Sequence, residues 1–354
     1  MSQRSDAPIL IVRHGDGLGR LPRFGERALA WIARHDPELA GEISVHETGA
    51  AAVPAAAAKA RAVVFWLADP LKERYPDCYE EAQAIGEVAA RRGALLVNPP
   101  ATLSNTVRST QTRLWQEAGL PCPAGARYRS RAELEALLAS AELPVLVCAD
   151  RFDLRPAIRV CRTPDEVLAA EHAGGYPGMV TPFIDPRHSW GERDPASVWA
   201  RFYHRKRAFV LGDVVVPSHV TFSEAPIVSW NASIFRRYRG WGSVLQPLAL
   251  VRRWDRLALA ADNAFWRGAP EHPALIRRAA AALGFGFAAV DYATFADGSV
   301  ILWDATPHPY IPEWHHAGMP VVRHTRARVH GLYAAIAGYL RNLLHEHAER
   351  RRFA

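Results

Sequence analysis

The sequence is poor in cysteine and has no long apolar run, and each shortage excludes a class of protein. The cysteines are Cys78, Cys122, Cys148 and Cys161, which are scattered without CxxC spacing. This scatter argues against a zinc ribbon or a disulfide framework and favours free thiols. No window approaches the roughly eighteen uninterrupted apolar residues of a membrane span, so we expect no membrane partner. Residues 1–7 are polar and lack the apolar core of a secretory signal, which predicts a cytoplasmic protein.

Lysine is also scarce, and its scarcity means that another side chain supplies the positive charge of the protein. The formal net charge is +7, yet lysine occurs only at Lys59, Lys72 and Lys206, so arginine supplies almost all of the positive charge. Arginine suits phosphate and carboxylate because its planar fork donates two parallel hydrogen bonds. The arginines are spread along the whole chain and are not gathered in one basic tail. We therefore expect anionic ligands and do not expect a nucleic-acid partner.

The first hundred residues alternate short apolar runs with helical patterns, which predicts βαβ units around a small parallel sheet. The expected strands are residues 9–12, 62–67 and 95–97, and the expected helices are residues 27–34 and 79–91, with a further helix from the alanine-rich stretch 50–60. A proline pair at 99–100 ends this domain. Beyond it, mixed strand and helix patterns predict a central and a C-terminal α+β subdomain, including a helix over 104–118.

An apolar hairpin over residues 288–306 carries the most chemical information. Asp-Gly at 297–298 predicts a two-residue turn, which places Asp291 directly opposite Asp304. Two facing carboxylates repel unless a cation lies between them or one is protonated. Thr306 shares a face with Asp304 and offers another oxygen, so we predict a Mg²⁺ site. The alternatives are an acid/base pair, or an aspartate that turns to solvent or pairs with a nearby arginine.

This hairpin is similar to the metal-binding hairpin of ATP-grasp enzymes, in which a strand aspartate is followed by a glycine turn and an acid-x-Asn-x-x-Pro strand end. Asp304 stands where the family usually has glutamate, and Thr306 stands where it has asparagine. The resemblance implies an α/β N-terminal (pre-ATP-grasp) domain with a parallel sheet, followed by α+β ATP-grasp subdomains. The implied boundaries are 1–100 for the first domain, 101–185 for the central subdomain and 186–354 for the C-terminal one.

A second segment extends the resemblance. Residues 207–219 look like the strand pair in which ATP-grasp ligases, including the RimK-like ribosomal-protein glutamate ligases, place an arginine beside the triphosphate and substrate. Arg207 aligns with that arginine, which implies a catalytic role. The alternative is a solvated edge strand, because Arg201, Arg205 and Arg207 share one face.

The resemblance, which spans roughly residues 95–315, also implies a nucleotide site. Arg108 falls where the family has one lysine, and Cys148 ends the strand that carries a second one. The glycine-rich phosphate loop expected next is replaced by residues 149–155. The hinge strand whose backbone holds adenine, and whose following acid holds ribose, corresponds to Phe183, Ile184 and Asp185.

The resemblance implies a ligase that uses ATP and Mg²⁺ to activate a carboxylate as an acyl phosphate for attack by an amine or another nucleophile. Its substrates would be small molecules or peptides, and a homodimer is left open. The loss of the lysine at Cys148 and of the glycine-rich loop leaves a second hypothesis, a catalytically degenerate ATP-grasp protein that acts as a binding or scaffold module. The third is a metal enzyme that uses its C-terminal histidines: His308, His315, His316 and His324.

Overall fold

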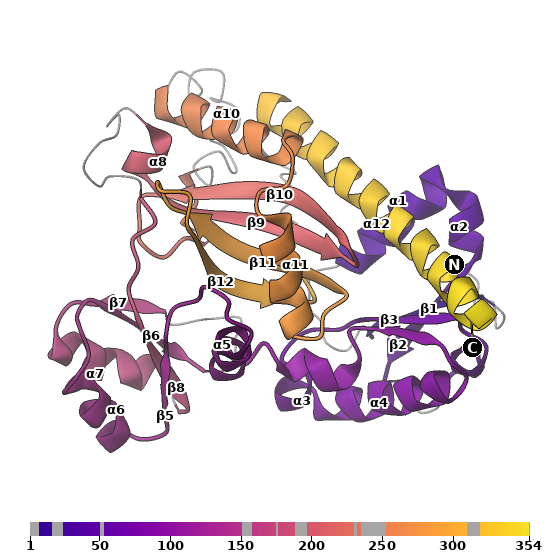
Figure 1. Ribbon diagram of the computed structural model, residues 1–354, viewed down its shortest axis with the longest axis horizontal. Helices are drawn as coiled ribbons and strands as arrows, with labels where there is room; N and C mark the ends of the chain where they lie inside the picture. Colours follow the sequence, from indigo (N-terminus) through magenta and orange to yellow (C-terminus); the bar gives the residue numbers. More distant parts are fainter. Residues whose placement is uncertain are drawn as a thin grey trace.

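The computed structural model describes residues 7–15, 24–49, 53–150, 158–174, 176–187, 197–229, 232–234, 253–309 and 319–353. These described residues form three four-stranded sheets, one in each of the three segments expected from the sequence (Figure 1). Within the described ranges, no helix combines the length and the apolarity of a membrane span.

The N-terminal sheet is parallel throughout, with the order β2-β1-β3-β4. Its strands are β1 (Ile9–His14), β2 (Ile43–Thr48), β3 (Ala62–Trp66) and β4 (Leu95–Val97). The helices are α1 (Phe24–His35), α2 (Pro37–Gly41), α3 (Leu71–Arg74) and α4 (Pro76–Arg91). This arrangement confirms the predicted α/β domain. The alanine-rich stretch forms only a short 3-10 turn in its described part, η2 (Ala55–Ala58), and β2 was not predicted.

The central sheet is antiparallel, with the order β5-β8-β6-β7. Its strands are β5 (Ala126–Tyr128), β6 (Val145–Ala149), β7 (Arg159–Cys161) and β8 (Gly178–Pro182), and its helices are α6 (Arg131–Leu138) and α7 (Pro164–Gly174). The helix predicted over 104–118 begins later than expected, as α5 (Arg108–Glu117), and a 3-10 turn, η3 (Pro100–Ser104), precedes it. Figure 1 shows α5 between the central sheet and the rest of the molecule.

The C-terminal sheet is antiparallel, with the order β10-β9-β11-β12. Its strands are β9 (Tyr203–Leu211), β10 (Val214–Ser223), β11 (Phe287–Thr294) and β12 (Val300–Thr306). The described helices of this segment are α8 (Val198–Arg201), α10 (Arg253–Arg267), α11 (Pro273–Ala282) and α12 (Met319–Phe353). Helix α12 runs back along the molecule to the N-terminal domain (Figure 1).

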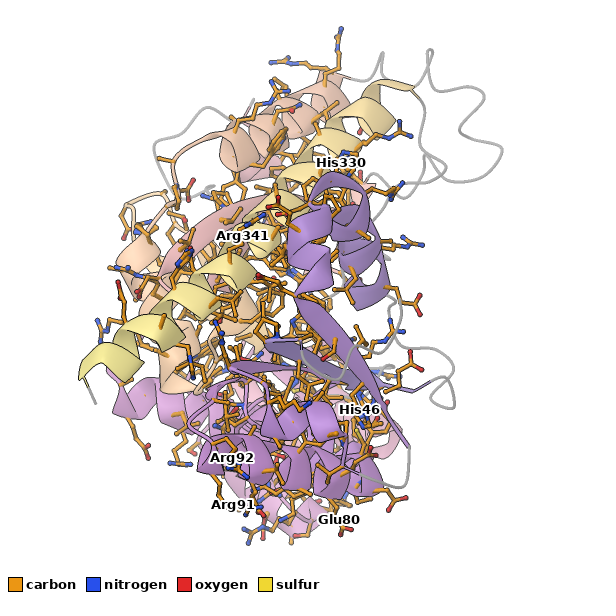
Figure 2. All side chains as sticks on the ribbon, turned by 90° about the vertical axis from the view of Figure 1, so that its right-hand side faces the viewer. His46, Glu80, Arg91, Arg92, His330 and Arg341 are labelled. Atoms are coloured by element: carbon orange, nitrogen blue, oxygen red, sulfur yellow. The ribbon has the colours of Figure 1, made fainter. Side chains whose placement is uncertain are left out.

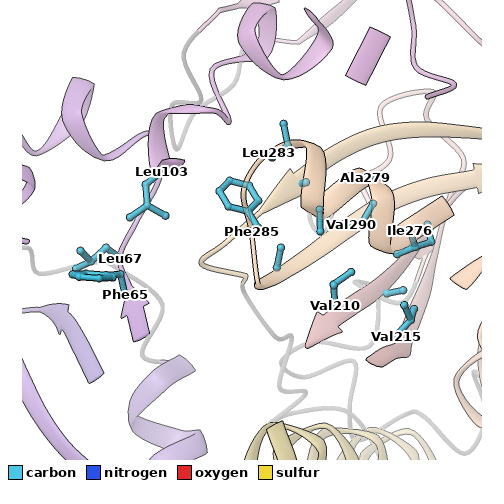
Figure 3. Close-up of a cluster of buried hydrophobic side chains, with 14 of the residues drawn as sticks. Phe65, Leu67, Leu103, Val210, Val215, Ile276, Ala279, Leu283, Phe285 and Val290 are labelled. Atoms are coloured by element: carbon cyan, nitrogen blue, oxygen red, sulfur yellow. The ribbon is translucent and has the colours of Figure 1, made fainter. Parts of the chain in front are cut away.

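Each face of the C-terminal sheet shares a core with the N-terminal domain. On one face, Phe209 and Phe287 pack with residues of β1, β3 and α12. Figure 2 views the side on which α12 crosses this domain, with His330 and Arg341 labelled. On the other face, Val210 and Val290 belong to a cluster with α11 that continues through η3 to β3 (Figure 3). The first and last segments of the chain therefore form one packed body.

The turn of the β11–β12 hairpin has three residues, not the two that were predicted. The N–H of Phe295 donates to the carbonyl of Ser299 at 2.8 Å, and Gly298 adopts a φ of 84° that favours glycine. The longer turn shifts the register by one residue next to it. A bulge at Trp303 then restores the register, so Asp291 pairs with Asp304 as predicted.

Candidate functional site

A cavity of about 180 Å³ lies where α5, the central sheet and the C-terminal sheet meet. Its wall is largely apolar, with Leu146, Met179 and Phe183 among its residues. The charged residues that line it are Arg108 from α5, Arg205 from β9 and Asp304 from β12; the hinge residues after β8 complete the wall. A concave apolar site with a few converging charges is the usual form of a small-molecule site.

The structure brings together five of the residues predicted for the site. All five line the cavity, although they come from α5, β6, the hinge after β8 and β12: Arg108, Cys148, Phe183, Ile184 and Asp304. Their roles in binding remain predictions.

The other four predicted residues lie beside the cavity and have partners within the protein. Arg207 and Asp291 pair with each other on the C-terminal sheet. Thr306 bonds to a residue of the N-terminal domain, and Asp185 is held by its own neighbour Arg187, whose Nη2 lies 2.6 Å from Oδ2. To contact a ligand in the cavity directly, each of these four residues would have to give up or share its present partner.

Asp291 is held by two arginines of the neighbouring strand. Residues 205 and 207 share one face of β9 because side chains alternate along a strand, and Arg207 is the register partner of Asp291. Arg207 Nε donates to Oδ1 at 2.6 Å and its Nη2 donates to Oδ2 at 2.7 Å, while Arg205 Nη1 lies 3.0 Å from Oδ2. Burial acts to raise the pKa of Asp291, but the charges of Arg205 and Arg207 outweigh it and hold this pKa below its ordinary value.

Asp304 shows the opposite behaviour. Burial is the main cause that raises the pKa of its carboxyl; the charge of Asp291 adds to the rise, while Arg108 opposes it. The two facing aspartates therefore coexist because one is neutralised by arginines and the other binds its proton more tightly. The sequence-based alternative in which an aspartate pairs with a nearby arginine describes Asp291.

Thr306 connects this sheet to the N-terminal domain. Its Oγ1 donates to Asp69 Oδ1 at 3.0 Å and accepts from the N–H of His308 at 3.3 Å. Asp69 follows β3 and is buried; burial and then the charge of Asp304 raise its pKa to about 7, against hydrogen bonds from Thr106 and Thr306. The sequence analysis missed Asp69. Its position after the carboxyl end of a parallel strand was the available signal, because ligands of open α/β sheets lie at that edge.

The end of β6, where the resemblance leads us to expect a lysine, has a structural use. The N–H and the hydroxyl of Ser109 donate to the carboxylate of Asp150 at 2.8 and 2.9 Å, and Arg127 lies 2.7 Å from the same carboxylate. Asp150 thus fixes the start of α5 and so the position of Arg108. Cys148 is buried, and burial raises the pKa of its thiol, so this position supplies no charge to a phosphate. Residues 151–155 of the segment that corresponds to the phosphate loop lie outside the described residues.

The donor set does not fit Mg²⁺. Both oxygens of Asp291 are bound by arginine, and the hydroxyl of Thr306 donates to Asp69, which leaves Asp304 as the remaining predicted ligand. In the part of the chain that the structure describes, no three His, Cys, Asp or Glu side chains meet as a metal site. Mg²⁺ needs near-octahedral oxygen ligands, normally with one or two carboxylates available.

The histidine-based alternative gains no support. Burial lowers the pKa of His308 to about 4, and its ring lies 6.4 Å from that of His14, centroid to centroid. His315 and His316 lie outside the described residues, as does the side chain of His324.

No family model and no curated protein matches this sequence. Solved structures do match over most of its length. A RimK-domain ATP-grasp protein from Sphaerobacter thermophilus is 16% identical with a TM-score of 0.52, covering 94% of this chain and 99% of its own. The ATP-grasp ligase PsnB, solved with the precursor peptide PsnA2 and AMPPNP, is 14% identical with a TM-score of 0.53, covering 93% and 99%.

D-cycloserine synthetase DcsG is 15% identical with a TM-score of 0.53, covering 92% of this chain and 99% of its own. Identities this low establish the fold alone. The matched structures agree with the topology above, a parallel N-terminal sheet followed by two antiparallel ones. The chain has the ATP-grasp fold.

Proposed function

We propose that this protein is an ATP-dependent ligase that activates a carboxylate as an acyl phosphate. The observation that carries the proposal is the cavity itself, in which Arg108 and Arg205 converge beside the apolar wall that includes Phe183 and Ile184. The apolar wall suits a nucleobase, and guanidinium groups suit phosphate oxygens. The ligases of similar fold make this reaction class the natural candidate.

The reaction would proceed in two steps. An oxygen of the substrate carboxylate attacks the γ-phosphorus, the bond to the β–γ bridging oxygen breaks, and ADP leaves. A nucleophile such as an amine then attacks the acyl carbon, and phosphate leaves as the amine loses a proton. Arg108 and Arg205 would neutralise charge on the phosphate oxygens, which is how proteins mainly accelerate phosphoryl transfer. Arg207 would act by holding Asp291 and, through it, Arg205.

The hinge would receive the nucleoside. The N–H of Phe183 donates to the carbonyl of Pro144 at 3.0 Å, so a base edge would use other main-chain groups of the hinge. Asp185 would meet the ribose, and Arg187 already orients its carboxylate through Nε at 3.0 Å from both oxygens. PsnB was solved with a peptide and DcsG is a small-molecule synthetase, so both substrate classes belong in the test. A cytoplasmic location would suit such an enzyme.

The test is ADP release. Purified protein is incubated with ATP, with and without magnesium, together with a panel of carboxylates, amines and peptides, and ADP and phosphate are quantified. Arg108→Ala should abolish most of the release. Arg113→Ala is the matched control, since Arg113 lies on the same helix, is exposed and pairs with Glu117. Absence of nucleotide binding by the parent protein would overturn the proposal.

A nucleotide-binding protein without turnover is the second candidate. Cys148 favours it, because a buried neutral thiol stands where the resembling family has a lysine. The two candidates separate in the same experiment. Binding of ATP without ADP release under any substrate combination would select the binding protein.

A further inference from the structure

The polar end of the C-terminal sheet is organised around one carboxylate. Asp291 is almost fully buried, with its side chain 2% exposed; it accepts hydrogen bonds from two guanidinium nitrogens of Arg207 and forms an ion pair with Arg205. Bidentate pairing by Arg207 fixes the plane of the carboxylate. The shared carboxylate then holds the two like-charged guanidinium groups close together. Asp291 is in this way an anchor for arginines.

Arg205 has a donor that the protein does not use. Its Nε is buried and, among the described residues, has no hydrogen-bond partner, although Nη1 of the same group reaches Asp291. Arg205 also lines the cavity, where its side chain remains 24% exposed. Buried donors in native proteins are nearly always satisfied, so an orphaned guanidinium N–H on an arginine that lines the cavity points to a missing acceptor. An anionic oxygen is the acceptor that a guanidinium binds most strongly.

The charges around the cavity also favour an anion. Among the described residues that line it, Arg108 and Arg205 bring two positive charges, and Asp304 brings at most one negative charge. A divalent cation would find Asp291 already occupied and would add repulsion next to two arginines. The cluster supplies the positive charge that a metal ion supplies elsewhere, and it does so with fixed donors.

We propose that the guanidinium cluster of Arg205 and Arg207 on Asp291 takes the place of a divalent cation, so that the cavity binds the phosphates of a nucleotide free of magnesium. This inference rests on the proposed nucleotide site. Arg205 would bind a phosphate oxygen through its guanidinium group, with Arg108 on the same anion from α5. Asp291 would hold the arginines in position and would bind no metal.

The experiment compares affinities in two buffers. ATP is titrated calorimetrically into the full-length protein in EDTA and, separately, in saturating magnesium chloride. The affinity for ATP in EDTA should be at least equal to the affinity in magnesium. It should be about tenfold higher if the arginines repel the magnesium ion without screening. Binding that requires magnesium would overturn this inference and leave the proposed function standing. Absence of binding in both buffers would overturn both.

Variants separate the arginines from the rest of the fold. Arg205→Ala should weaken ATP binding in EDTA by about tenfold or more, since a charge-assisted bond is lost. Arg113→Ala should leave the affinity unchanged. If Arg205→Ala melts at a lower temperature than the parent, Arg205→Gln serves as the second variant because it keeps polar volume. Parent-like affinity in the folded variant would overturn the assignment.

A metal titration gives a readout without nucleotide. Mn²⁺, used as a paramagnetic stand-in for Mg²⁺, is added to the free protein, and bound ion is measured by electron paramagnetic resonance. We expect no bound ion in this region, and hence no difference between the parent and Asp291→Asn. Stoichiometric binding that Asp291→Asn abolishes would show that the aspartate is a metal ligand and would overturn the inference.

Discussion

One face of strand β9 has two halves that serve different ends. Phe209 and Leu211 in its second half pack against α12 and the N-terminal sheet, whereas Arg205 and Arg207 in its first half hold Asp291. All four side chains of β9 point to the same side because side chains alternate along a strand. The apolar half is stabilised by the burial of apolar side chains, which is not directional. The polar half is stabilised by ion pairs and hydrogen bonds, which require a specific geometry. The same strand thus supplies folding free energy at one end and part of the candidate site at the other.

The largest expected effect tests the apolar half. Phe209 is fully buried, so Phe209→Ala should lower the free energy of unfolding by about 4 kcal/mol through lost burial and a residual cavity. Denaturant unfolding followed by circular dichroism measures this change. Val214→Ala is the control on the adjoining strand, since Val214 is exposed. Equal losses in the two variants would show that this half is not the core that we describe.

Substitution in the polar half should have a nearly equal effect on stability and should also change nucleotide affinity. Arg207→Ala leaves the buried Asp291 with one arginine, and breaking a buried ion pair costs about 3 kcal/mol or more. Nucleotide affinity should fall as well, because Arg205 loses its anchor. Arg207→Lys should recover only part of both, since the bidentate fork is lost. A loss of affinity with unchanged stability would place Arg207 in direct contact with the ligand.

Secondary structure could be predicted where a segment is governed by its own periodicity. Strand β2 was missed because Ser44, His46 and Glu47 interrupt its apolar residues. Helix α10 was missed because two of its four buried residues are aspartates, so its inward face is not apolar. Asp262 is satisfied there by the N–H of Val220 and by Arg328, and these partners are distant in sequence.

In the candidate site, too, local features could be predicted from the sequence and contacts between distant residues could not. The pairing of Asp291 with Asp304 followed from local hairpin chemistry, and it survived a wrong turn length because a bulge restored the register. The link from Thr306 to Asp69 spans 237 residues, and the sequence carries no local signal for such a contact. The arginines of β9 were recognised as sharing a face, but their common partner on β11 depended on which strands become neighbours.

A smaller effect is the pH response of the N-terminal sheet, against which the apolar half of β9 packs. His14, at the carboxyl end of β1, accepts from the N–H of Ala68 through Nε2 at 2.8 Å. Burial is the main cause that lowers the pKa of His14 to about 3 from 6.5, with help from His308 and Arg74. The unfolded chain therefore binds more protons between these values, so stability is full above pH 6.5 and falls as the pH drops toward 3.

His14→Gln should remove this dependence, because the amide oxygen can accept from Ala68 without titrating. The parent should lose about 2 kcal/mol between roughly pH 6.5 and 5 from this group, and the variant should lose correspondingly less. Chemical unfolding at a series of pH values measures the difference. His345→Gln on the exposed face of α12 is the control. Parallel pH curves for the parent and His14→Gln would contradict the burial of a neutral imidazole.

The smallest expected change decides what Thr306 does. Thr306→Val keeps the shape of the side chain and removes the donor to Asp69, so the free energy of unfolding should fall by about 1 kcal/mol. ATP affinity should stay unchanged in both EDTA and magnesium, because the hydroxyl serves the contact with the N-terminal domain and is no metal ligand. Calorimetric titration beside denaturant unfolding measures both quantities on one preparation. A variant with parent-like stability but weaker binding in magnesium alone would return Thr306 to the role of a metal ligand, and with it the view that the polar half of the sheet is built around a cation.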